Sequence, residues 1–228
     1  MTQGTSDVPL ELIQTILGLL QRPELLTIRA ANKTMDALAT PKAFTEIVVQ
    51  DRVQSAEGFV GLQSCEKIVG YVKSVVFRGS AEQELTDDGL VCVSQAMKGL
   101  SGFPPLSSLR LDFSNFGENW SPLDDEDYEP SYGLKMQRAV LEGVSSGAPL
   151  PELKWLTIKG LITRPCDILA SESFAVLLRL LETLEVETTG PDLEGTYAPD
   201  EIGDTDFWDH MMTALAAAQV RNVSILAN

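Results

Sequence analysis

The chain has 228 residues, 44% of them hydrophobic and 22% charged, which is typical of a globular protein with a sizeable core and not of a disordered one. A net charge of −16 at pH 7 argues against partners that present phosphate, so we expect neither nucleic acid nor an anionic membrane surface to be bound. A single histidine and three scattered cysteines argue against a zinc site, and we expect no metal and no other cofactor.

The first 45 residues predict three short amphipathic helices. Pro23 suits the first turn of the second helix, and the third is expected over about residues 32–39, ending before Pro41. Helices this short are marginal on their own, so their apolar side chains need either the rest of the chain or a partner. The apolar residues of the first helix recur at the i, i+3, i+4 and i+7 spacing of one stripe: Ile13, Ile16, Leu17 and Leu20.

Residues 46–228 predict alternating strands and helices. Six segments share the template apolar-x-x-apolar-x-apolar, whose last two apolar positions alternate as in a strand with one buried face. The helices are expected between these segments, over about 56–70, 87–99, 134–144, 171–180 and 205–219. The pattern therefore predicts an α/β fold with a parallel sheet. The templates begin at Phe44, Val72, Leu106, Leu153, Leu181 and Val220.

One such template with a helix per unit is the leucine-rich-repeat arrangement, in which the strands line one side of a solenoid. The alternation also describes a doubly wound α/β fold. The shared template, and the lack of a glycine-rich phosphate turn after any strand, favour an irregular leucine-rich-repeat-like β/α solenoid.

Two acidic stretches interrupt the repeats. Residues 112–132 contain seven acids, and residues 181–220 contain ten, with no Lys or Arg in either. They are either solvated loops or an acidic rim that attracts a basic protein. The acidic run at 124–129 resembles a hard-cation site only in composition, because it lacks the EF-hand spacing.

An enzyme is the remote alternative. Residues 143–147, GVSSG, match G-x-S-x-G, which would pair Ser145 with His210. The match follows a helical pattern and not a strand, so we expect Gly143 to end a helix and the serines to lie in a loop. We therefore predict no enzymatic activity and no catalytic residues.

Residues 8–44, VPLELIQTILGLLQRPELLTIRAANKTMDALATPKAF, resemble an F-box. Met35 takes the place of the usual Trp, and methionine fills irregular core gaps. Irregular leucine-rich repeats often follow F-boxes, particularly in fungal proteins, which fits the order of parts here. The matching positions are Val8-Pro9, Glu11, Ile16-Leu17, Leu20, Pro23, Leu25-Leu26, Asn32-Lys33, Pro41 and Phe44.

The resemblance implies an α+β chain that serves as the substrate-recognition subunit of an SCF-type cullin–RING ubiquitin ligase. The F-box would occupy residues 1–45 and bind a Skp-type adaptor, and through it a cullin. The repeats, over 46–228, would hold an unknown and possibly basic protein substrate. The implied adaptor contacts are Val8, Pro9, Leu10, Ile13, Ile16, Leu17, Leu20, Leu25 and Leu26.

Polar residues between the strand apolar positions are the candidate substrate contacts. They are Lys73, Arg110, Asp112, Lys154, Thr157, Glu185 and Glu187. The alternative is a leucine-rich-repeat interaction module whose amino-terminal helices only cap the solenoid, packing on Ile47 and Val49. No signal peptide and no apolar run long enough for a membrane span is found in the sequence, so we expect a cytoplasmic or nuclear protein.

Overall fold

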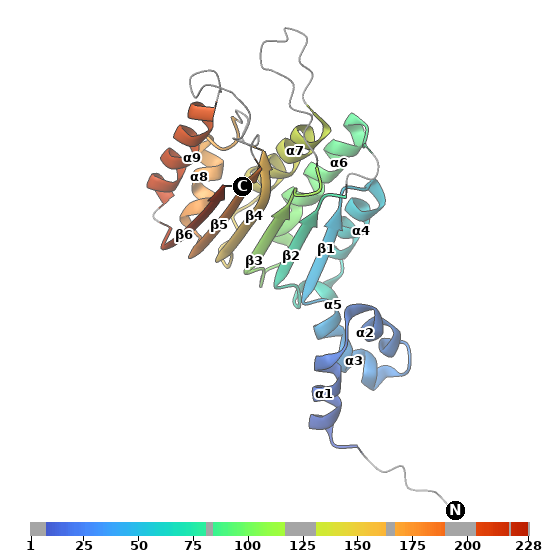
Figure 1. Cartoon of the computed structure of the whole chain (residues 1–228). Coiled ribbons are helices and arrows are strands. Elements are labelled where there is room, and N and C mark those ends of the chain that lie inside the picture. Colours follow the sequence, from blue (N-terminus) through green and yellow to red (C-terminus); the bar gives the residue numbers. More distant parts are fainter. Residues whose placement is uncertain are drawn as a thin grey trace, which may run out of the picture. The chain divides into compact units, whose positions relative to one another are not determined.

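The computed structural model describes residues 8–80, 84–116, 131–162, 167–189, 204–218 and 220–227 (Figure 1). The chain divides into two compact units, Met1–Glu46 and Ile47–Asn228, and each is described by itself. The acidic run at 124–129 lies outside the described residues.

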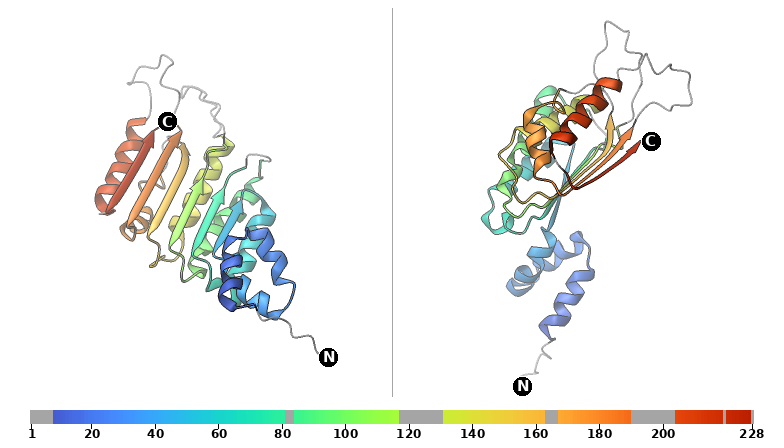
Figure 2. Two further views of the ribbon diagram at one scale, coloured as in Figure 1. Left: turned by 60° about the horizontal axis from the view of Figure 1, so that its bottom comes forward. Right: turned by 90° about the vertical axis from the view of Figure 1, so that its left-hand side faces the viewer.

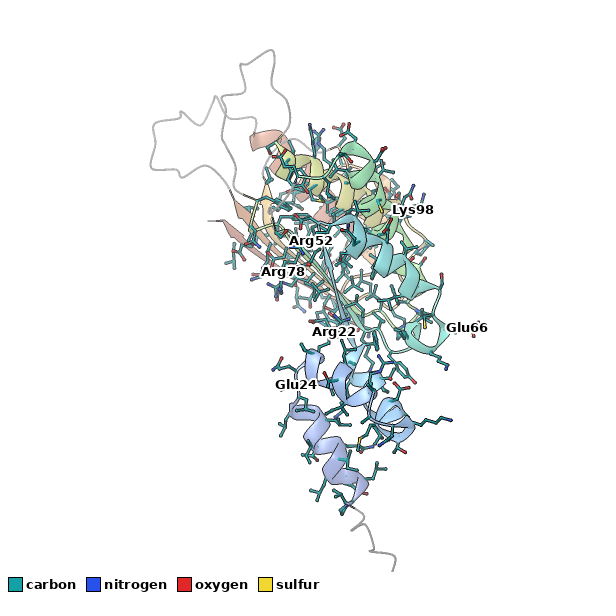
Figure 3. All side chains as sticks on the ribbon, turned by 90° about the vertical axis from the view of Figure 1, so that its right-hand side faces the viewer. Arg22, Glu24, Arg52, Glu66, Arg78 and Lys98 are labelled. Carbon is teal, nitrogen blue, oxygen red and sulfur yellow. The ribbon has the colours of Figure 1, made fainter. Side chains whose placement is uncertain are left out.

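The first unit contains three helices, α1 (Leu10–Leu19), α2 (Arg22–Arg29) and α3 (Lys33–Ala43). A capping box starts α2, in which the backbone N–H of Gln21 donates to the Glu24 carboxylate at 2.7 Å. Figure 3 labels Arg22 and Glu24, two residues of the first turn of this helix. Asn32 caps α3 by accepting a hydrogen bond from the Met35 N–H at 2.9 Å. The core of the unit is small and consists of Leu17, Leu25, Ala39, Ala43 and Phe44.

The expectation that α3 ends before Pro41 is wrong, because the helix continues through Pro41 to Ala43. Proline removes one backbone hydrogen bond from the last turn. Buried contacts keep this turn helical all the same, since Ala43 is in the core and the Lys42 ammonium donates to the Gln14 carbonyl of α1 at 2.6 Å. Tertiary packing therefore outweighs the local preference for a helix end.

The second unit is built on a six-stranded parallel sheet whose strands follow one another in chain order (Figure 1). Each template contributes its last two apolar residues to a strand, so the α/β class with a parallel sheet is confirmed. The register aligns the middle template residues across the sheet: Val75, Leu109, Leu156, Leu184 and Val223. The strands are β1 (Glu46–Gln50), β2 (Ser74–Arg78), β3 (Ser108–Asp112), β4 (Trp155–Ile162), β5 (Thr183–Thr189) and β6 (Asn222–Ala227).

The helices that link the strands lie on one face of the sheet, as the edge-on view of Figure 2 shows. Large side chains fill the space between the two layers, including Phe77, Phe103 and Phe113. No described helix covers the opposite face, which we call the open face. The helices are α4 (Val53–Gln63), α5 (Glu66–Val69), α6 (Asp87–Lys98), the 3-10 helix η1 (Gly99–Gly102), α7 (Tyr132–Ser146), α8 (Glu172–Arg179) and α9 (Asp204–Ala218).

Candidate interaction surfaces

Helix α1 carries a row of apolar side chains that face solvent. Leu12, Ile16 and Leu19 are 54%, 54% and 80% exposed, and they recur at i, i+4 and i+7. This spacing places them along one side of the helix, which we call the α1 stripe. The second apolar row, which contains Leu17, turns into the core of the unit, so α1 is apolar on two adjacent sides and buries only one of them.

The structure separates the expected adaptor contacts into three groups. Val8, Pro9, Leu10, Ile16 and Leu26 are exposed, whereas Ile13 and Leu20 are half-buried. Leu17 and Leu25 are only 3% and 4% exposed.

Leu17 and Leu25 therefore belong to the core of the helical unit and not to a free surface. Leu12 and Leu19 are exposed apolar residues that were not among the expected adaptor contacts. The helical periodicity of the sequence could have identified them, because they form a second apolar stripe beside the first.

The open face of the sheet presents three rows of side chains that cross the strands. The first row is Ser74, Ser108, Trp155, Thr183 and Asn222, and the second is Val76, Arg110, Thr157, Glu185 and Ser224. The third row begins with Arg78, Asp112 and Lys159. The chain thus brings polar side chains from five consecutive strands onto one surface.

Hydrogen bonds and ion pairs link neighbouring side chains on the open face. The Arg110 guanidinium lies 3.1 Å from the Asp112 carboxylate, and the Thr157 hydroxyl donates to Glu185 at 3.2 Å. The Lys159 ammonium lies 3.4 Å from the Glu187 carboxylate. Most charges on this face therefore have a partner of opposite sign, which fixes their positions more than it stabilises the fold.

The surroundings of Asp112 on the open face shift the pKa of its carboxyl group. Burial alone would raise the pKa of this carboxyl group. Hydrogen bonds from Ser114 and the charge of Arg110 outweigh burial, so the pKa lies below its ordinary value of 3.8. Asp112 is therefore a firmly ionised anion at the carboxyl end of β3.

The expected substrate contacts are placed on or beside this face. Arg110, Thr157 and Glu185 are neighbours in the second row, in register across β3, β4 and β5. Lys73 is exposed just before β2. Lys154 precedes β4 and pairs with Glu182 at 3.2 Å.

Trp155 is the prominent residue of the open face that the sequence reasoning missed. Its side chain is 45% exposed, and its register neighbours are Ser108 on β3 and Thr183 on β5. It occupies the position just before the middle apolar residue of its template. Because the strand alternates, this position faces away from the helices, which is the signal that would have found it.

The G-x-S-x-G match does not form a nucleophile elbow. The elbow needs a sharp turn between a strand and a helix. The expectation of a helix end at Gly143 and a serine loop is wrong, because α7 continues to Ser146 and the Ser145 hydroxyl donates to the Glu142 carbonyl at 3.3 Å. Gly143 is instead the point of close contact between α7 and α6, where Ser94 lies.

Among the described residues, no group of three or more His, Cys, Asp or Glu side chains is placed to hold a metal ion. Within the same part of the chain, no helix has both the length and the apolar character needed to cross a membrane. Comparison of the chain with protein families, with curated proteins and with solved structures found no match.

Proposed function

We propose that the chain is the substrate-recognition subunit of an SCF-type cullin–RING ubiquitin ligase. The helical unit, Met1–Glu46, would act as an F-box that binds a Skp-type adaptor, and through it a cullin. The unit Ile47–Asn228 would be an irregular leucine-rich-repeat-like solenoid that holds a target protein. Such a complex acts in the cytoplasm or the nucleus.

The α1 stripe is the observation that carries this proposal. Leu12, Ile16 and Leu19 are exposed on a unit that already buries a core of its own. Full burial of one such side chain contributes about 1.5–3 kcal/mol, so leaving three of them in water is costly unless a partner covers them. The only ionisable side chain of α1 is Glu11, so the helix can enter an apolar groove with little loss of charge solvation.

The open face supports the second half of the proposal. It is a broad polar surface on a six-stranded sheet, and no described helix covers it (Figure 2). The subunit would carry out no covalent chemistry. Its contribution would be to hold the target close to the activated ubiquitin, which raises the effective concentration of the reacting lysine.

The test is co-expression of the full chain with a Skp-type adaptor, followed by gel filtration at low micromolar concentration. We expect the two proteins to elute together. The triple variant Leu12→Ser, Ile16→Ser, Leu19→Ser should elute apart from the adaptor while remaining folded. The matched control, Val60→Ser, Val91→Ser, Val176→Ser, removes three exposed apolar side chains from the helical layer of the other unit and should leave the complex intact.

Separate elution of a folded wild-type chain would exclude the adaptor-binding role. The chain would then be a leucine-rich-repeat interaction module whose amino-terminal helices only cap the repeats. Equal loss of the complex in both triple variants would show that the adaptor binds by non-specific hydrophobic association and not through the α1 stripe.

A further inference from the structure

Trp155 is the first residue of β4 and lies in the first row of the open face. Its neighbours in the first row are Ser108 and Thr183, whose side chains are much smaller than an indole ring. Its indole is nearly half exposed, although tryptophan is usually the most valuable side chain to bury. A flat aromatic surface is thus available to a partner on the open face, at the amino-terminal end of β4.

Glu185, on the neighbouring strand, has a carboxylate that pairs with no Lys or Arg among the described residues. Glu185 on β5 is in register with Thr157, which is two residues along β4 from Trp155. The strand spacing and rise place the Cα atoms of Trp155 and Glu185 roughly 8 Å apart on the same face. Glu185 is exposed, and the one contact that the described residues give its carboxylate is the Thr157 hydroxyl at 3.2 Å.

The nearby acids differ from Glu185 because each already lies beside a cation. Asp112 lies against Arg110, Glu187 against Lys159, and Glu182 against Lys154. The Thr157 hydroxyl holds the Glu185 carboxylate in place without neutralising it. Glu185 is therefore an oriented negative charge on the same face as the exposed Trp155, one strand away.

The geometry points to a receptor for a lysine or arginine side chain, formed by Trp155 and Glu185, that takes an extended basic segment of a partner protein. A cation within about 6 Å of an indole centre is attracted by the electrons of the ring, and a carboxylate beside the ring adds a direct charge interaction. This inference rests on the proposed function only in treating the open face as the surface that holds a target, and it specifies the chemistry of that target.

The charge of the whole chain favours the same partner. The net charge is −16, and residues 181–220, which include β5, contain ten acids and no Lys or Arg. A basic segment would be drawn toward such an acidic chain, whereas the phosphates of a nucleic acid would be repelled. On the other side of the ring, Arg110 is held by Asp112, so its charge is countered at the β3 border of the receptor.

The inference is tested by fluorescence anisotropy of a fluorescein-labelled decapeptide of alternating lysine and serine, titrated with the full chain in physiological salt and without adaptor. Trp155→Ala and Glu185→Gln should each raise the Kd about fivefold. Trp155→Tyr keeps an aromatic ring and should bind with an intermediate Kd. It also tests the receptor if the alanine variant does not fold.

Two controls separate this receptor from general attraction of a basic peptide to an acidic chain. Glu142→Gln removes the same charge from an exposed position on α7 and should change the Kd by less than about twofold. The Trp155→Ala, Glu185→Gln double variant should bind little worse than either single variant, because both residues act on one cation. A decapeptide with glutamine in place of lysine should not bind.

Equal weakening by Glu142→Gln and Glu185→Gln, an unchanged Kd for the Trp155 variants, or no binding of the lysine peptide to the wild-type chain would overturn the inference. Its failure is distinguishable from failure of the proposed function. Trp155→Ala and Glu185→Gln should still elute with the adaptor, and the α1 triple variant should still bind the peptide.

Discussion

Gly143 of α7 lies against the backbone of Ser94 in α6. A Cβ atom at residue 143 would overlap the Ser94 carbonyl oxygen and would stand 2.9 Å from the Cβ of Met97. The two helices therefore meet with no side chain between them at this point. Because the obstructing atom belongs to the backbone, a larger residue would have to move a whole helix.

Gly143→Ala should destabilise the second unit by about 1–3 kcal/mol, through overpacking at this helix contact. The matched control is Gly58→Ala in α4, where a new Cβ would meet no atom within 4 Å. There the substitution should stabilise the unit by about 0.5–1 kcal/mol, since alanine has the higher helix propensity. Urea unfolding followed by circular dichroism measures both, and the same sign for the two variants would contradict the explanation.

Truncation of Leu17 should destabilise the helical unit far more than truncation of Leu19, although both lie on α1. Leu17→Ala removes a core side chain and should cost the helical unit about 2–5 kcal/mol. Leu19→Ala removes a side chain that is already in water and should change stability by less than about 0.5 kcal/mol. Hydrogen exchange of the amides in α1, α2 and α3 reports the difference. Faster exchange in the Leu19 variant would show that the α1 stripe also supports the fold.

Asp112 should titrate below its ordinary pKa of 3.8, and carboxyl resonances followed by NMR give the value. Because the pKa is depressed in the folded state, the stability that this group contributes is present above the unfolded pKa, about 3.9, and is lost as pH falls through the folded pKa. Ser114→Ala removes one of the hydrogen bonds that lower the pKa, so the Asp112 pKa should rise. An unchanged pKa in that variant would rule out the hydroxyl as a cause.

Tyr132 should remain neutral at a pH where an ordinary tyrosine ionises. Burial, with the negative charges of Asp51 and Glu84 nearby, raises the pKa of its phenol to about 12. The stability that follows from this shift is present below pH 10 and is lost as pH rises toward 12. Ultraviolet absorbance of tyrosinate during an alkaline titration should therefore contain a late component, which is the ionisation of Tyr132 at a higher pH than an ordinary tyrosine. Tyr132→Phe should remove it, and a late component that persists would assign it to another tyrosine.

The sheet was the most predictable part of the fold. Leu109, Leu111, Leu156 and Ile158 alternate with polar residues, and this period of two is a direct consequence of strand geometry. The register then aligns equivalent template positions on neighbouring strands. The local pattern was sufficient because β1 to β5 all bury their middle template residue, and only β6 leaves this residue, Val223, exposed.

The errors arise where tertiary contacts override a local rule. Pro41 is a helix breaker by itself, yet the core contact of Ala43 keeps α3 helical past it. Gly143 suggests a helix end, but its real role is the close approach of α6, which is far away in sequence. The residues next to Pro41 and Gly143 in the sequence give no indication of either contact.

The sequence also could not show which apolar residues of α1 are buried and which are exposed. Leu17 and Leu19 have the same side chain and sit two residues apart, and both lie on regular apolar stripes. Only the positions of α2 and α3 decide which stripe is covered. Trp155 is the reverse case, since its type predicts a core residue while its place in the strand turns it outward.

The chain-order arrangement of the strands makes the sheet a linear array. Each strand pairs only with the strand just before it and the strand just after it in the chain, so no central strand holds the whole sheet together. Such an array can open from either end, one strand at a time. A ligand that spans β3, β4 and β5 would bind only when all three strands are folded. Its binding would therefore couple the three strands, so that they unfold and refold together.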